Sequence, residues 1–230
     1  MRKLLVLFFA ILLISLSPAA TFATEGNAEA KQAEYSELFE SYIDRLTMEG
    51  VPPRIVGMLS HQKAVVIKKA LEMTIRDGYI AFLPVIPRSH LTVNTQMAMV
   101  EKDGNKGFNY LNPNLISNKV KTWNKPYYIF NVEDGEATRN KSPHDAEKIL
   151  KNSERSPLTV AETVSLALHT RVLTRHSLDA TGSRFSSYGV PSIWFNESIP
   201  KLGWVSIGRQ MLTSSSSSPR RGTPSCGSRQ

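Results

Sequence analysis

The spacing of apolar residues changes once along this chain, and that change limits the fold more than any other feature. Over Glu34–Met48 apolar residues recur at the three- and four-residue intervals of one helix face, and further helices are expected from Pro53 and from Ser60. After Asp77-Gly78 the chain turns to short apolar runs separated by turn signals, which are typical of strands. Strands and helices are then mixed without a regular βαβ rhythm, so we expect an α+β fold with its helices first.

The second part of the chain predicts a mixed or antiparallel sheet with two packed helices. Tyr127–Val132 is the clearest strand, whereas Pro84 confines the run Tyr79–Ile86 to a sheet edge or an irregular segment. One helix is expected to start at Ser142-Pro143, where the serine can cap it, and the other at Thr159, which opens a capping box. Shorter strands are expected at residues 97–100, 107–111, 192–196 and 202–207.

The first 23 residues have the layout of a secretory signal peptide. Arg2 and Lys3 precede the apolar run Leu4–Leu16, which at about 13 residues is too short to span a bilayer comfortably. Cleavage is expected after Ala23, or alternatively after Ala19, and an uncleaved anchor is the competing interpretation. We therefore expect a secreted, periplasmic or cell-envelope protein that has no transmembrane helix once the signal is removed.

These signals divide the chain into a signal peptide (1–23), a helical segment (24–78), an α+β core domain (79–207) and a low-complexity basic tail (208–230). The tail is rich in serine and arginine and is expected to be disordered. Its Cys226 is the one cysteine of the chain. We expect a solvated thiol or an intermolecular link there, because one cysteine cannot close an internal disulfide.

The formal net charge of +8 points to a nucleic-acid or membrane partner only when its distribution is ignored. Much of the excess lies in the signal peptide and in the stretch after Glu197, the last carboxylate of the sequence. The body between these segments carries nearly equal numbers of basic and acidic residues. This distribution argues against a nucleic-acid-binding domain.

The clearest cluster of functional groups is an acidic turn directly after the strand Tyr127–Val132. It contains Glu133, Asp134 and Glu136 around Gly135. Three carboxylates could bind a divalent metal such as calcium, and two could divide acid and base roles as in sugar hydrolysis. The spacing matches no EF-hand loop, and the simplest interpretation is a solvated turn in which the glycine adopts a positive φ. No other cofactor is predicted.

A second cluster lies in the loop Arg175–Phe185. Backbone N–H groups and Arg184 could bind an anion there. His176, Asp179 and Ser183 are the residue types of a catalytic triad, but triads are rarely built from consecutive residues and no G-x-S-x-G motif is present. A structural loop is the alternative interpretation.

Several sequence blocks, in a fixed order, resemble an uncharacterised bacterial family that carries only a domain-of-unknown-function label. The blocks are FLPVIP, YLNPN, PYYIFNVEDGEATR, SPLTVAE, RHSLDATGSR and PKLGW, and they cover roughly Ile80–Trp204. The resemblance implies a bacterial protein but no activity, cofactor or catalytic residue. The stretch after PKLGW departs from the family until PSCGSR, which fits its ending. A local change of reading frame would produce this, and resequencing that confirmed the frame would remove the hypothesis.

Three functions follow from these patterns. The first is a non-catalytic ligand-binding or envelope-associated module with an unknown small-molecule or envelope ligand. The alternative is an exported hydrolase that uses the acidic loop Glu133–Glu136 with the loop Arg175–Arg184. A hydrolase requires the two loops to converge in one cleft, with a carboxylate whose pKa is shifted. A third option is an interaction protein that uses the aromatic face of the first helix, although packing of that face is preferred.

Overall fold

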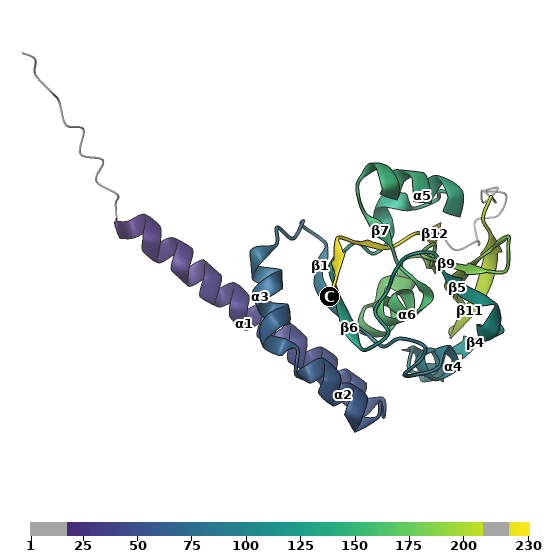
Figure 1. Ribbon diagram of the computed structural model, residues 1–230, viewed down its shortest axis with the longest axis horizontal. Coiled ribbons are helices and arrows are strands. Elements are labelled where there is room, and N and C mark those ends of the chain that lie inside the picture. Colours follow the sequence, from purple (N-terminus) through teal and green to yellow (C-terminus); the bar gives the residue numbers. More distant parts are fainter. Residues whose placement is uncertain (1–17, 209–220) are drawn as a thin grey trace, which may run out of the picture.

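The structure, a computed structural model, describes residues 18–208 and 221–230 (Figure 1). Most of the expected signal peptide and residues 209–220 of the expected tail lie outside this range. The predicted α+β class is confirmed by six α-helices and several mainly antiparallel sheets among the described residues. None of the described helices has the length and apolarity needed to cross a bilayer.

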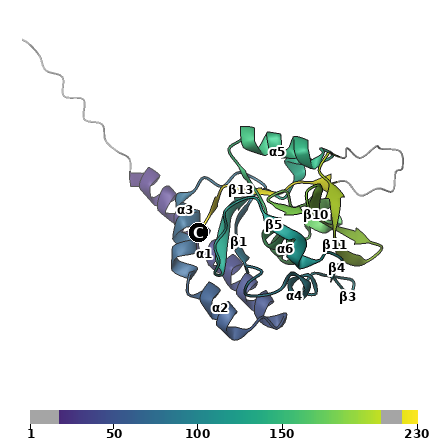
Figure 2. The same cartoon turned by 45° about the vertical axis from the view of Figure 1, so that its right-hand side comes forward.

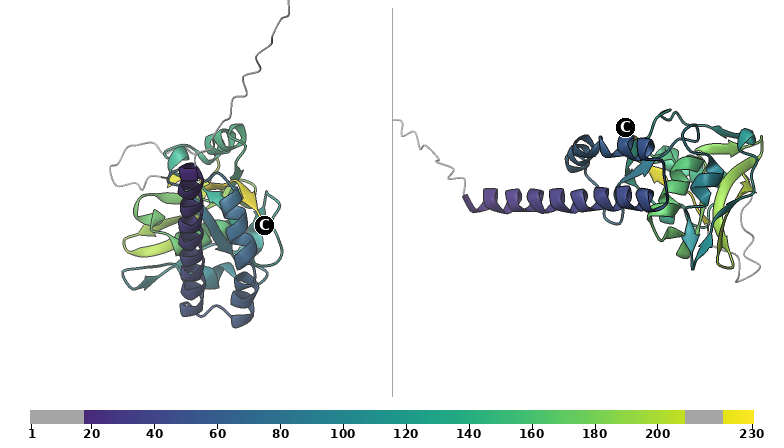
Figure 3. Two further views of the ribbon diagram at one scale, coloured as in Figure 1. Left: turned by 90° about the vertical axis from the view of Figure 1, so that its left-hand side faces the viewer. Right: turned by 90° about the horizontal axis from the view of Figure 1, so that it is seen from below.

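Three helices form the N-terminal part: α1 (Pro18–Met48), α2 (Pro53–Ser60) and α3 (Lys63–Glu72). α1 begins earlier than the periodic pattern indicates, because the residues before Glu34 include the strong helix formers Ala, Glu, Lys and Gln. Its N-terminal half projects beyond the rest of the molecule (Figure 3).

The aromatic face of α1 packs inward. Phe39 stacks on Tyr128 with ring centroids 5.4 Å apart, and Tyr35 and Tyr42 meet the edge of Phe82. All of these side chains are buried. The preferred interpretation of the face as packing is therefore confirmed, and it is not available to a partner.

A three-stranded sheet lies next to these helices, in the order β1 (Ile80–Val85), β6 (Tyr127–Val132) and β14 (Ser228–Arg229). β1 is an edge strand, as Pro84 predicts. A seven-stranded sheet is built around the hairpin of β10 (Gly189–Asn196) and β11 (Ile199–Ser206). Its other strands are β4 (Phe108–Asn109), β5 (Ile116–Asn118), β8 (Ser177–Asp179), β9 (Ser183–Phe185) and β12 (Arg221–Gly222). Two small pairs join β2 (Glu101–Lys102) to β3 (Asn105–Lys106) and β7 (Ser156–Pro157) to β13 (Ser225–Cys226).

The two helices of the second part begin where their caps predict. The Ser142 hydroxyl accepts from the backbone N–H of Asp145 at the start of α5 (Pro143–Asn152). Thr159 forms the expected capping box at the start of α6 (Val160–His169). α6 is buried along most of its length and lies between the two larger sheets (Figures 1 and 2).

The strand expected at residues 97–100 is wrong. Met97 is the last residue of α4 (Val93–Met97), and residues 98–99 form a turn. The Thr92 hydroxyl caps α4 by accepting from Thr95 N–H. Both Val93 and Met97 are buried at helical spacing, and a turn follows. A short apolar run cannot by itself distinguish the end of a helix from a strand. Short 3₁₀ turns complete the chain at Pro113–Leu115, Glu136–Thr138 and Val172–Thr174.

The low-complexity basic tail expected over 208–230 is wrong for residues 221–230, which we call the C-terminal strap. β12 pairs with β8, β13 with β7 and β14 with β6, so the strap crosses the whole body (Figure 2). Composition is misleading here because Arg221 and Arg229 pair with the distant buried carboxylates of Asp179 and Glu162.

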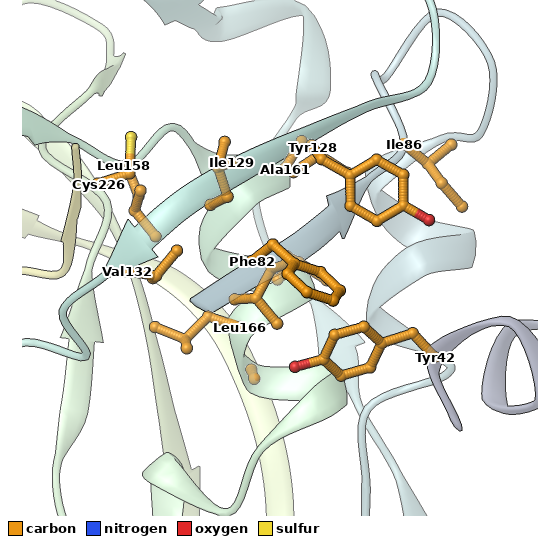
Figure 4. Close-up of a cluster of buried hydrophobic side chains, with 14 of the residues drawn as sticks. Tyr42, Phe82, Ile86, Tyr128, Ile129, Val132, Leu158, Ala161, Leu166 and Cys226 are labelled. Carbon is orange, nitrogen blue, oxygen red and sulfur yellow. The ribbon is translucent and has the colours of Figure 1, made fainter. Parts of the chain in front are cut away.

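Cys226 belongs to the hydrophobic core. Its side chain is 0% exposed, and Figure 4 shows it in the same cluster as Leu158, Ile129 and Val132. The thiol is free and buried. Both a solvated thiol and an intermolecular link are therefore wrong for this fold.

Candidate functional site

The acidic turn joins β6 to the 3₁₀ turn Glu136–Thr138. Gly135 has a φ of +103°, as the turn was expected to require. The turn is less solvated than expected, because Glu133 is only 3% exposed and its Oε1 accepts from Ala137 N–H at 2.9 Å. Asp134 Oδ1 accepts from Glu136 N–H at 3.1 Å. Backbone geometry thus explains much of the turn.

Burial raises the pKa of the Glu133 carboxyl, while the backbone N–H groups of Ala137 and Gly135 oppose that rise. The Oε2 atom of Glu133 is buried and has no hydrogen-bond partner within the described part of the chain. The turn therefore holds a carboxyl group with a shifted pKa, which is one of the two features that the hydrolase hypothesis requires.

The acidic turn and the start of the loop Arg175–Phe185 do converge. Arg175 forms an ion pair with Asp134. His176 Nε2 lies 4.0 Å from Asp134 Oδ1 and 4.0 Å from Glu136 Oε2. Arg139 pairs with Glu136 at 2.7 Å. The ion pairs of Asp134 with Arg175 and of Glu136 with Arg139 lie beside His176, which is only 2% exposed and whose Nε2 has no hydrogen-bond partner among the described residues.

The candidate metal ligands do not form a coordination site. Among the described residues, no group of three or more His, Cys, Asp and Glu side chains is placed to hold a metal ion. Asp134 is engaged by Arg175, Glu136 by Arg139, and Glu133 is turned into the protein. The arrangement favours ion pairing within the chain over metal binding.

The triad residue types do not assemble either. The Ser183 hydroxyl accepts from Val160 N–H and donates to Asn118 Oδ1. His176 Nδ1 lies 3.1 Å from the carbonyl oxygen of Ser177. Asp179 accepts instead from Ser192 and Arg221, so Ser183, His176 and Asp179 are not linked to one another as a triad.

Arg184 lies apart from the acidic turn. It forms an ion pair with Glu147 of α5 and donates to the carbonyl oxygens of Thr181 and Ser183. These contacts hold the loop against α5. Of the five candidate catalytic residues, the structure therefore brings Glu133, Asp134 and His176 to one place.

Asp179 lies in a separate pocket of about 340 Å³, which we call the hairpin pocket. Asp179 and Gly203 both lie opposite Ser192 in the sheet, so these residues and Trp194 share one face of β8, β10 and β11. That face is the floor of the pocket. The pocket is lined by Lys141, Pro143, Asp179, Trp194, Trp204, Val205, Ser206 and Arg221.

The two tryptophans belong to different faces of the hairpin. Trp204 is paired with Pro191, so its side chain points away from the face that carries Trp194. Its ring stacks near Phe185, with centroids 6.2 Å apart. Trp194 therefore supplies the aromatic surface of the pocket floor.

The polar floor of the hairpin pocket is a buried ion pair. Asp179 is 1% exposed, and its Oδ1 accepts from the Ser192 hydroxyl at 2.6 Å and from an Arg221 nitrogen at 3.2 Å. Burial raises the pKa of Asp179, and the charge of Arg221 opposes that rise. Arg221 Nε is buried and has no partner in the described part of the chain. An unpaired donor thus lies beside the pocket.

Sequence reasoning missed Ser192 and Arg221. Ser192 was part of an expected strand, and its only signal was a polar residue within an apolar run. Arg221 fell in the stretch that was expected to be disordered. Its partner, Asp179, is 42 residues away in sequence, and no local pattern links them.

This body defines an α+β domain with a polar pocket and a C-terminal strap, and its fold alone does not show its chemistry. The chain belongs to a family of unknown function, DUF5701, which it matches over residues 46–217. The expected membership in an uncharacterised family is confirmed. The match extends beyond the expected limits of Ile80 and Trp204, and so includes most of the stretch that the sequence suggested as foreign. No curated protein and no solved structure gave a significant match.

Proposed function

We propose that this chain is an exported bacterial ligand-binding module, and that the hairpin pocket holds a small polar ligand. The observation that carries the proposal is the buried pair of Asp179 and Arg221 beneath that pocket, where Arg221 Nε has no partner among residues 18–208 and 221–230.

A buried ion pair usually adds little to the stability of the folded state, because the free-energy cost of removing both charges from water offsets most of their electrostatic attraction. Here the pair lies beside an opening of about 340 Å³, which is within the usual range of small-molecule sites. Such sites combine apolar walls with a few fixed polar groups. Asp179 and Arg221 supply the fixed polar groups, and Trp194 supplies an apolar surface.

The charges and shape of the pocket indicate the ligand class. Lys141 and Arg221 outnumber Asp179, so a ligand that carries a carboxylate is favoured. The Trp194 ring suits the apolar face of a sugar or another flat body. A sugar acid combines both features and is the ligand class that we propose.

The test is a calorimetric titration of the full chain with glucuronic acid and with glucose. We expect glucuronic acid to bind more tightly, and Lys141→Met or Trp194→Leu to weaken it. Lys121→Met and Tyr110→Leu, which alter exposed residues that do not line this pocket, are the matched controls and are expected to leave the affinity unchanged. Equal effects of the two pairs of substitutions, or no binding of either sugar, would contradict the proposal.

Export rests on the signal-peptide pattern of residues 1–23. We expect the protein in the medium, periplasm or envelope fraction with Thr24 as its first residue. Fractionation followed by N-terminal sequencing tests this. A chain that is found in the cytoplasm and still begins with residue 1 would contradict export.

A second candidate function, an exported hydrolase, is favoured by the convergence of Asp134, Glu136 and His176. The burial of His176 weighs against it, since a general base must reach its substrate. Assays with 4-nitrophenyl acetate and 4-nitrophenyl glycosides test this. Hydrolysis that disappears in Asp134→Asn with His176→Gln would favour the enzyme, and background rates in both chains would exclude these residues.

A further inference from the structure

A second pocket, of about 710 Å³, opens beside α2 and is independent of the hairpin pocket. One wall is a single face of α2 that carries Arg54, Gly57 and Met58, and His61, the C-cap residue of α2, continues this face at the spacing of successive helix turns. The segment 123–127 lies across from it. We call this cavity the α2 pocket.

Gly57 is the first unusual feature of the α2 pocket. It lies in the interior of a helix, where glycine is unfavourable compared with alanine. Nothing requires a glycine for packing, because an added Cβ would meet no atom within 4 Å. Its φ is also not in the left-handed region. The effect of Gly57 is to leave the helix backbone open toward the pocket.

The charges around the α2 pocket are the second feature. Arg54 and Lys125 line it, are exposed, and make no ion pair or side-chain hydrogen bond within residues 18–208 and 221–230. His61 adds an imidazole whose Nδ1 lies 2.5 Å from the carbonyl oxygen of Gly57. The described lining contains no Asp or Glu side chain, although the chain's last residue, Gln230, borders it. Gln230 is held in place, because one oxygen of its terminal carboxylate accepts from Tyr128 N–H. The two cations of the lining, Arg54 and Lys125, outnumber this one anion.

The third feature is a flat apolar surface. Trp123 lines the pocket and is 50% exposed, and Met58 and Pro126 add apolar atoms. Exposure of the apolar indole ring to water is unfavourable, and a ligand bound in the cavity would cover that ring. Aromatic rings stack on other flat groups, and a cation at the rim selects a negative charge.

We propose that the α2 pocket binds an organic anion with a flat apolar body. The anionic group pairs with Arg54 and Lys125, and the body lies against Trp123 and the open backbone at Gly57. This ligand class follows from the charge and shape of the α2 pocket, which is distinct from the hairpin pocket. The proposal is therefore tested independently of the proposed function.

Two fluorescent probes with the same body separate the two parts of the proposal. The anionic probe is 8-anilinonaphthalene-1-sulfonate, and its uncharged counterpart is N-phenyl-1-naphthylamine. We expect one saturable site on the full chain for the sulfonate. The double substitution Arg54→Ala with Lys125→Ala is expected to lower the affinity for the sulfonate roughly five- to tenfold. It is expected to lower the affinity for the neutral probe less than about twofold.

The double substitution Lys68→Ala with Lys148→Ala is the matched control. It also removes two positive charges, one from α3 and one from α5, and neither residue lines the pocket. It is expected to leave both probes unchanged. An equal loss of sulfonate binding in the control pair would overturn the proposal, because net charge alone would then account for it. Unchanged sulfonate binding in the Arg54 and Lys125 variant would overturn it as well.

Gly57→Leu provides a test with effects of opposite sign. Leucine favours the helix, so the melting temperature is expected to rise by roughly 2–4 °C. The same side chain fills the pocket, so the affinity for both probes is expected to fall at least about tenfold. Wild-type binding of both probes in a folded Gly57→Leu chain would overturn the site.

Discussion

Arg229 and Glu162 form a two-point ion pair that ties the end of the chain to the start of α6. Arg229 Nε lies 2.6 Å from Glu162 Oε1, and a second guanidinium nitrogen lies 3.0 Å from Oε2. Tyr127 donates to the same Oε1 at 2.7 Å, and Thr159 N–H donates to Oε2 at 2.7 Å. One fully buried carboxylate therefore joins the C-terminal strap, β6 and the cap of α6.

Glu162→Gln is expected to destabilise the protein by about 3 kcal/mol, because it leaves the largely buried Arg229 without a counter-charge. Urea unfolding of both chains measures this change. Glu72→Gln is the control, since Glu72 pairs with Lys68 at an exposed position where an ion pair contributes at most about 1 kcal/mol. Equal losses for the two substitutions would mean that the strap is not anchored through Glu162.

The thiol of Cys226 is expected to be unreactive in the folded protein. Burial raises its pKa to about 12, and the Glu162 carboxylate adds to this. At pH 8 roughly one thiol in ten thousand is then ionised, and the thiolate is the reactive form. We expect Ellman's reagent to label Cys226 only after urea is added. Complete labelling within seconds in native buffer would show that the strap is detached.

The features that could be predicted from the sequence are local ones. The helix starts at Ser142 and Thr159, the edge position of β1 and the positive φ of Gly135 each depend on a few neighbouring residues. Short-range rules capture such positions because the side chain bonds to backbone within three or four residues.

The features that were missed depend on contacts between distant segments. Residues 221–230 have the composition of a tail, yet their arginines match buried acids that are far away in sequence. The same limit applied to the site. The acidic turn was visible, but its contact with His176 and the pairing of Asp179 with Arg221 depend on how the strands are ordered.

Glu133→Gln is expected to stabilise the protein at neutral pH, by roughly 1 kcal/mol, because a neutral amide is easier to bury than an unpaired carboxylate oxygen. The pKa of Glu133 is raised by folding, so the unfolded chain loses its proton first as pH increases above 4.5. Wild-type stability therefore falls relative to the variant above that pH, and the two chains converge below it.

Melting temperatures of both chains between pH 4 and pH 8 measure this difference, and a divalent-metal titration at pH 7 accompanies them. A variant that is less stable at pH 7, together with a calcium-dependent rise in melting temperature in the wild type alone, would restore the metal interpretation of the acidic turn. Gln96→Glu, which places a carboxylate at another buried position, is expected to show the opposite pH dependence to Glu133→Gln.

Gly135→Ala tests whether the acidic turn is held against the strap. Its φ of +103° is unfavourable for alanine, and the new Cβ would lie 2.9 Å from the backbone carbon of Gly222. Strain and overlap together are expected to cost about 2–4 kcal/mol. Gly104→Ala is the matched control, because Gly104 has a φ of +79° but nothing within 4 Å of an added Cβ, so strain alone costs about 1 kcal/mol. Denaturant unfolding of the two variants separates overlap from strain. Equal costs would mean that β12 does not pack on the acidic turn.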